Sequence, residues 1–134
     1  MPTLQTNPTP PPTPTPTPTP AATVDYYSVT LPGQGEFSVG SGGRDVFEFT
    51  VPGPGTLTAT AQWSGTAESL SLPLSGPGEA GFYARADGSS PLTLTFQFTA
   101  EVLANGTEGW DLSVLNFGGG RATGTLTLDF APEG

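Results

Sequence analysis

Carboxylates and hydroxyls are the reactive side chains that this sequence offers. The 134 residues include 12 Asp and Glu and only three basic side chains, with no His and no Cys. Without His, the commonest general base and zinc ligand are missing, and a serine triad lacks its base. A glycosidase needs only two carboxylates, about 5 to 9 Å apart across a cleft. The acidic residues are spaced singly, however, so we expect solvated carboxylates, no catalytic residue and no enzymatic activity.

Calcium binding is the metal chemistry that oxygen-rich loops would allow. Calcium takes several oxygen ligands, often from loops. Asp45, Glu108 and Asp111 flank Gly-rich turns, and Asn105 and Asn116 add amide oxygens. These three carboxylates are the candidate calcium ligands. The alternative is a chain without a cofactor, since no D-x-D-x-D-G loop is present.

Aromatic side chains could bind a glycan if they lie on a solvent-exposed face of the sheet. Tyr26, Tyr27 and Tyr83 have no clear place in the alternation of the surrounding residues, so they are the candidate glycan-binding residues. Trp63 and Trp110 are in phase with apolar neighbours, and we expect them to pack in the core.

The N-terminal segment is of low complexity. Pro8 to Pro20 reads PTPPPTPTPTPTP, and alternating Pro predicts an extended polyproline II segment because it fixes φ and removes donors. Residues 1–22 are interpreted as a stalk or linker, and residues 23–134 as one domain. Thr with Pro is also typical of O-glycosylated stalks. The candidate glycosylation sites are Thr9, Thr13, Thr15, Thr17, Thr19 and the sequon residue Asn105.

From Ala22 onward, short alternating runs separated by Gly and Pro predict strands. No segment has a helical period. One polar face on each strand is typical of antiparallel sheets, and two such sheets packed face to face form a sandwich. The sequence therefore predicts an all-β, antiparallel β-sandwich of jelly-roll or Ig-like size. The expected strands are 24–31, 36–39, 45–51, 56–63, 70–74, 81–86, 92–102, 110–116 and 123–130.

Three details of this sandwich are also predicted. Strands 45–51 and 56–63 should pair as a hairpin. Pro73 cannot donate to a ladder, so its strand should be bulged or lie at an edge. Phe96 and Phe98 should be buried in a central strand. The predicted core consists of Phe47, Phe49, Leu57, Trp63, Leu94, Phe96, Phe98, Trp110, Leu112, Val114, Leu126 and Leu128.

Charge and composition limit the partners. The formal net charge of −9 opposes binding to nucleic acid and to anionic membranes. No apolar run approaches the roughly 20 residues of a membrane span, so no insertion is expected. Rows of Thr would give flat, weakly charged faces, and we expect copies of the chain to contact each other through Met1 to Ala22. Polysaccharide is the other expected partner.

Two stretches resemble the bacterial pre-peptidase C-terminal domain family. They are Asp45 to Pro52 (DVFEFTVP) followed by Gly55-Thr56-Leu57-Thr58, and Gly109 to Gly120 (GWDLSVLNFGGG) followed by Thr125 to Leu128. The resemblance extends over about residues 36–130. It implies an exported, non-catalytic β-sandwich module appended to secreted hydrolases and surface proteins, some members of which bind calcium or polymeric substrates.

The expected role is therefore a structural or accessory module outside the cell or at its surface. It would serve as a spacer, an adhesion element or a subunit of an extracellular filament. A carbohydrate-binding module on a secreted hydrolase is the alternative. Export is inferred from the stalk and the resemblance, since no signal peptide is visible in the sequence.

Overall fold

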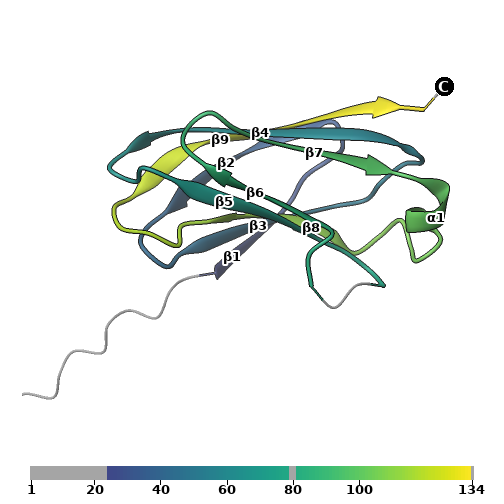
Figure 1. Cartoon of the computed structure of the whole chain (residues 1–134), viewed down its shortest axis with the longest axis horizontal. Helices are drawn as coiled ribbons and strands as arrows, with labels where there is room; N and C mark the ends of the chain where they lie inside the picture. The colour runs from purple at the N-terminus through teal and green to yellow at the C-terminus, as the bar shows by residue number, and fades with distance from the viewer. Residues whose placement is uncertain (1–23, 79–80, 134) are drawn as a thin grey trace, which may run out of the picture.

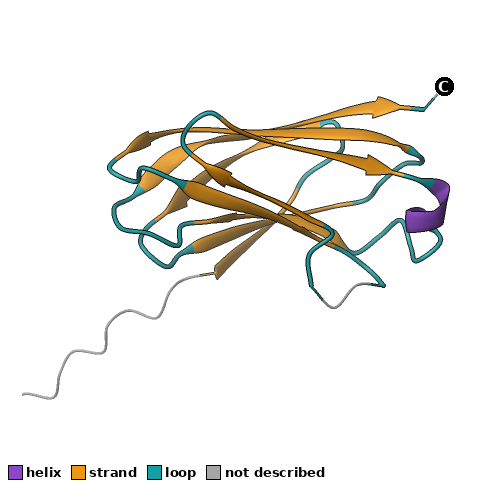
Figure 2. Ribbon diagram, viewed as in Figure 1, coloured by secondary structure: helices purple, strands orange, loops and turns teal. Residues whose placement is uncertain are grey.

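Strands make up almost all of the regular structure, as the alternating sequence predicts (Figures 1 and 2). The computed structural model describes residues 24–78 and 81–133. The all-β sandwich is confirmed. The strands are β1 (Val24–Ser28), β2 (Gly33–Val39), β3 (Arg44–Phe49), β4 (Gly55–Gly65), β5 (Leu70–Ser75), β6 (Ala84–Gly88), β7 (Leu92–Phe98), β8 (Trp110–Leu115) and β9 (Ala122–Pro132), with one helical turn, α1 (Ala100–Leu103).

The strands form two sheets of unequal width. The five-strand sheet has the order β1-β3-β8-β5-β6, and the four-strand sheet has the order β2-β9-β4-β7. All pairings are antiparallel except that of β1 with β3, which is parallel. Figure 1 shows the two sheets as stacked layers.

The core lies between the sheets and follows the period-two pattern. In β4, Leu57, Ala59 and Ala61 are fully buried, while the intervening Thr side chains face outward. Ten of the twelve predicted core residues are buried; the other two, Trp63 and Phe96, are only partly buried.

The predicted hairpin between residues 45–51 and 56–63 is wrong. The first run forms β3 of the five-strand sheet, and the second forms β4 of the four-strand sheet. The Pro-Gly turn between them therefore carries the chain from one sheet to the other. Because each strand has one apolar face, placing them in opposite sheets lets both faces bury against the same core.

The strand that contains Pro73 does not lie at an edge, which corrects a second expectation. β5 lies between β6 and β8. It pairs with β8 at Ser71 and again at Leu74, and the ladder is interrupted between these positions without a change of register. A gap in the ladder accommodates the missing donor of Pro73.

The longest alternating run ends earlier than predicted. β7 stops at Phe98, and the Thr99 hydroxyl then accepts a hydrogen bond from the backbone N–H of Val102 at 3.1 Å. This N-cap starts α1, so residues 100–102 leave the sheet. β7 is also an edge strand rather than a central one, although Phe98 is fully buried.

Candidate functional site

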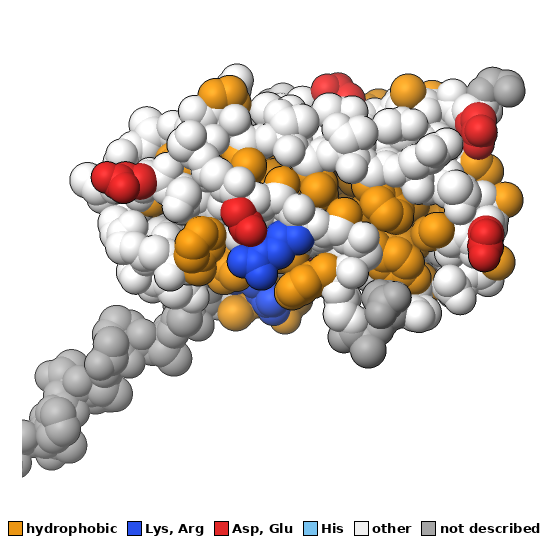
Figure 3. All heavy atoms as spheres, viewed as in Figure 1, with side chains coloured by type: hydrophobic (Ala, Val, Ile, Leu, Met, Phe, Trp, Pro, Cys, Tyr) orange, Lys and Arg blue, Asp and Glu red, His pale blue; other side chains and the backbone are white. Residues whose placement is uncertain are grey.

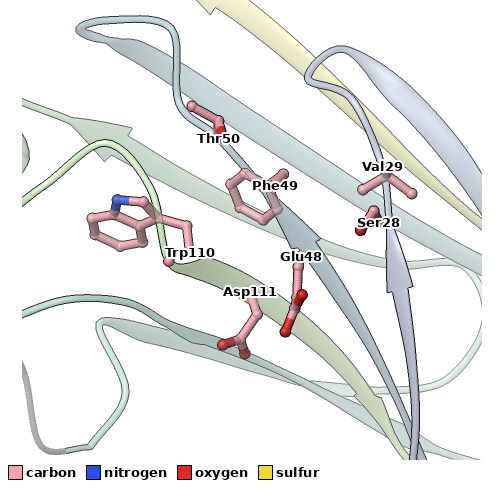
Figure 4. A pocket seen from close by; sticks show the side chains of 8 residues that line it. Ser28, Val29, Glu48, Phe49, Thr50, Trp110 and Asp111 are labelled. Atoms are coloured by element: carbon pink, nitrogen blue, oxygen red, sulfur yellow. The ribbon is translucent and has the colours of Figure 1, made fainter.

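Two carboxylates lie side by side on the outer face of the five-strand sheet. Glu48 of β3 and Asp111 of β8 are directly opposite each other in the antiparallel ladder, and Figure 4 shows both side chains pointing to the same side. They line a shallow pocket of about 350 Å³ at one end of the sheet. The other lining residues are Ser28, Val29, Phe49, Thr50, Gly109 and Trp110.

The electrostatics of this pair distinguish its two members. Partial burial raises the pKa of the Asp111 carboxyl; the guanidinium of Arg44 opposes the shift, and the negative charge of Glu48 adds to it. Glu48 itself is exposed. Both carboxylates project from the same face of one sheet, whereas a glycosidase holds the sugar between two carboxylates that flank the scissile bond. The pair therefore lacks the opposed geometry of glycoside hydrolysis.

The three candidate calcium ligands do not converge. Asp45 faces the core and is 2% exposed, whereas Asp111 lies on the opposite face of the same sheet. Glu108 is exposed in the loop before β8. Within residues 24–78 and 81–133, no group of three or more acidic side chains could hold a metal ion together. Calcium binding stays a prediction without a site assembled from these residues.

Asp45 instead ties β2 to β3. Its carboxylate accepts a hydrogen bond from the backbone N–H of Ser38 at 3.0 Å. Burial raises the pKa of Asp45; the Ser38 N–H acts in the opposite direction, and the charge of Asp25, its partner in β1, raises it further. The residue therefore has a structural role where the ends of β1, β2 and β3 meet.

The three tyrosines occupy three different environments. Tyr26 is 63% exposed and Tyr27 is 42% exposed, on opposite faces of β1. Tyr27 stacks on Phe47, with ring centroids 5.3 Å apart. Tyr83 is partly buried, packs against Trp110 and donates a hydrogen bond to the carbonyl of Pro77. Tyr83 thus packs partly against the core, whereas Tyr26 and Tyr27 are the more exposed of the three.

A groove runs along β2, where the two sheets differ in width. β2 packs against β3 and β8, so β1 projects beyond the four-strand sheet and all five of its residues are exposed. The groove has a volume of about 840 Å³ and is lined by Tyr27, β2 residues 34–38 and β9 residues 123–125. We call it the β2 groove.

The opposite side of the sandwich is closed. The edge strands β6 and β7 lie side by side there, and Ala84, Ala86 and Phe96 on these strands are partly buried against the core. Figure 3 shows hydrophobic side chains along the middle of the face in view, next to Lys or Arg side chains and an Asp or Glu side chain. The extra strand of the five-strand sheet therefore lies at the β1 and β2 side of the sandwich.

The outer face of the four-strand sheet carries aligned threonines. Thr60 of β4 is directly opposite Thr127 of β9 on one side and Thr93 of β7 on the other, which forms a row across three strands. We call this surface the threonine face. Its members are Thr56, Thr58, Thr60, Thr93, Thr95, Thr123, Thr125 and Thr127.

The glycosylation candidates divide between two parts of the chain. Asn105 is exposed in the turn after α1, where its amide donates to the carbonyl of Val102 at 3.3 Å. Thr9, Thr13, Thr15, Thr17 and Thr19 lie outside the described residues. Within the described part of the chain, no helix is long and apolar enough to cross a membrane.

No family model and no curated protein sequence matches this chain. Among solved structures, the pre-peptidase C-terminal domain of a collagenase from Bacillus anthracis is similar, with a TM-score of 0.59 and 15% sequence identity over 81% of this chain and 97% of that one. The fold is that of the pre-peptidase C-terminal domain. The predicted resemblance is thus confirmed at the level of the fold.

A second solved structure shares this fold. It is Aeromonas hydrophila PliG, a periplasmic lysozyme inhibitor of g-type lysozyme, with a TM-score of 0.55 and 10% identity over 81% of this chain and 100% of that one. One of these two neighbours is a C-terminal domain of an enzyme, and the other inhibits an enzyme.

Proposed function

We propose that this chain is an exported, non-catalytic accessory module, serving as a spacer, an adhesion element or a subunit of an extracellular assembly. One observation carries the proposal: the space between the sheets is filled mainly by hydrophobic side chains, and within residues 24–78 and 81–133 no three acidic side chains come together to form a reactive or metal-binding centre. A module of this kind displays its surface and has no need of an enclosed reactive centre. The pre-peptidase C-terminal fold and the stalk-like N-terminal segment support export.

Native material tests this proposal directly. The chain should be found in the extracellular or cell-surface fraction, and its intact mass should show hexose increments if the Thr residues of the stalk carry glycans. The full chain should also hydrolyse no polysaccharide or peptide substrate. Turnover that disappears in the Asp111→Asn variant and persists in Asp129→Asn would overturn the non-catalytic assignment, since Asp129 is an exposed carboxylate away from the pair.

Carbohydrate binding is the second candidate, and the β2 groove favours it. Tyr27 offers an exposed ring, and Gln34, Glu36 and Thr125 around it supply polar groups that could orient a sugar.

A glycan array with the full chain tests this candidate. Binding should be lost in Tyr27→Ala and retained in Phe117→Ala, because Phe117 is a comparably exposed aromatic residue in the β8–β9 loop. Tyr26→Ala then tells whether the outer face of β1 contributes. No bound glycan, or equal loss in Phe117→Ala, would exclude a specific site at Tyr27.

A further inference from the structure

The edge of β2 presents backbone groups to the β2 groove. β2 pairs with β9 on one side, and the described residues place no strand on its other side. The N–H of Ser38 points away from β9, since it donates to the carboxylate of Asp45. Backbone groups alternate sides along a strand, so the N–H and C=O of Gln34 and Glu36 also point away from β9. An edge of this kind is a template for another strand.

The space next to this edge is the position that a fifth strand of the β2-β9-β4-β7 sheet would occupy. The five-strand sheet continues to β1, whereas the four-strand sheet ends at β2. Tyr27, on the inner face of β1, is therefore 42% exposed although it stacks on buried Phe47. A fifth strand added to β2 would lie over Tyr27 and make the two sheets equal in width.

The Thr-Pro repeat of residues 12–20 has the sequence of a one-sided edge strand. In an extended chain, residues i and i+2 direct their backbone groups to the same side. Every Thr N–H of the repeat therefore lies on one side, and the other side carries only Pro, which has no N–H. Such a strand can pair with a free edge and cannot itself be extended by a further strand.

The orientation of the added strand follows from its side chains. In antiparallel pairing, the residues bonded to Gln34 and Glu36 stand directly opposite them and share their outward face. Thr side chains would then continue the threonine face, and Pro rings would point inward onto Tyr27. Packing of Pro on an aromatic ring is a recurrent mode of recognition for extended Pro-rich segments.

This orientation requires the repeat of another copy. Val24, where β1 begins, pairs with Arg44, and this end of β1 lies near the Ser38 end of β2. Only residues 21–23 separate the repeat from Val24, so the C-terminal end of a chain's own repeat must stay near the Ser38 end of β2. If that repeat lay along the β2 edge, it would therefore run parallel to β2. In a parallel ladder the bonded Thr would stand opposite Gly35 and face inward, which places the Pro rings in solvent.

Charge favours the same arrangement. Residues 1–24 contain no charged side chain, and all 12 acidic residues lie at position 25 or later. Two domains of net negative charge repel each other, whereas the uncharged segment can approach a second domain without this cost. The repeat is thus the part of the chain best suited to contact another copy.

We propose that the Thr-Pro repeat of one copy adds antiparallel to the free edge of β2 in a second copy. The contact is head-to-tail, so it yields an open chain of subunits unless the rotation closes a ring. The inference goes beyond the accessory role, which does not depend on it. Docking requires the backbone groups of the β2 edge in addition to the Tyr27 ring, whereas glycan binding in the same groove would use the Tyr27 ring without these backbone groups.

Substitution at Glu36 of the full chain tests the edge. Glu36→Pro removes the charged side chain and also a backbone N–H that points away from β9, so the pairing of β2 with β9 keeps its hydrogen bonds. Glu36→Ala is the matched control, because it removes the same charge and keeps this N–H. Sedimentation velocity over a concentration series should show association of the unmodified chain and of Glu36→Ala. Glu36→Pro should weaken it by about tenfold or more, through one lost hydrogen bond and the obstructing ring. Equal association of Glu36→Pro and Glu36→Ala would overturn the proposal.

A second measurement avoids the chance that Glu36→Pro fails to fold. Amide hydrogen exchange at Gln34 and Glu36 is followed by NMR in the unmodified chain at low and high concentration. Protection of both amides that increases with concentration supports the proposal. Protection at all concentrations would mean that the chain's own repeat occupies the edge, and absence of protection at all concentrations would mean that nothing does. Either result overturns docking onto a second copy.

Discussion

Replacement of Phe98 by Ala should destabilise the domain more than replacement of Phe96, although both face inward on β7. Phe98 is fully buried and contacts Trp110 and Phe96 edge-on, with ring centroids 4.8 and 4.9 Å apart. Truncation of a buried Phe costs about 3 to 5 kcal/mol in total, and the loss of two aromatic pairs places Phe98 in the upper part of this range. We therefore expect about 4 to 5 kcal/mol for Phe98→Ala.

Phe96 provides the matched control. It lies two residues away on the same strand and is only partly buried, so Phe96→Ala should cost about 2 to 3 kcal/mol. Urea unfolding followed by circular dichroism measures both losses. With a slope of about 1 to 2 kcal/mol/M, the midpoint of Phe98→Ala should fall by about 2 to 5 M. Equal losses, or a larger loss for Phe96→Ala, would show that the relative burial of Phe96 and Phe98 is assigned wrongly.

Three further predictions follow from titration and capping. The pKa of Asp45 is raised in the folded state, so its contribution to stability is present at low pH and is lost as the pH rises through that pKa. In the unmodified chain, the free energy of unfolding should therefore fall across this acidic range. Asp45→Asn should flatten that fall, as measured by urea unfolding at several pH values. Glu48→Gln should lower the pKa of Asp111 and Arg44→Met should raise it, and carboxyl NMR titrations that show no change would contradict their placement. Thr99→Ala should cost about 1 kcal/mol in thermal unfolding, and Thr99→Ser should restore most of it.

Local pattern was sufficient for the elements of this fold. Runs such as 56–63 and 123–130 alternate apolar and polar residues, and a period of two assigns each side chain to a face whatever the neighbouring strand is. The prediction therefore identified nine strands and most of the core. It overran at residues 99–102, because the alternation continues there while the hydroxyl of Thr99 caps a helical turn.

The candidate surfaces could not be predicted from the sequence, because they depend on which strands pair and on which residues stand opposite each other. Nothing near Glu48 or Asp111 indicates that these residues are partners, and only the pairing of β3 with β8 brings them together. Tyr26 and Tyr27 were identified as exposed candidates by their uncertain phase, and the structure places them on opposite faces of β1. The β2 groove had no local signal, since it results from one sheet being a strand wider than the other.

The sequence by itself determined that this chain forms strands with one apolar and one polar face, and it predicts that residues 1–22 form an extended Pro-rich stalk or linker. Those properties depend on neighbouring residues: side-chain alternation, the fixed φ of Pro, and the absence of apolar groups to bury. Only the tertiary structure decided that β3 and β4 belong to different sheets, that β5 is an interior strand despite Pro73, and that β1 projects beyond β2. Strand partners are chosen by how apolar faces distant in the chain fill a common core, and a Pro-Gly turn permits both a hairpin and a crossing between sheets.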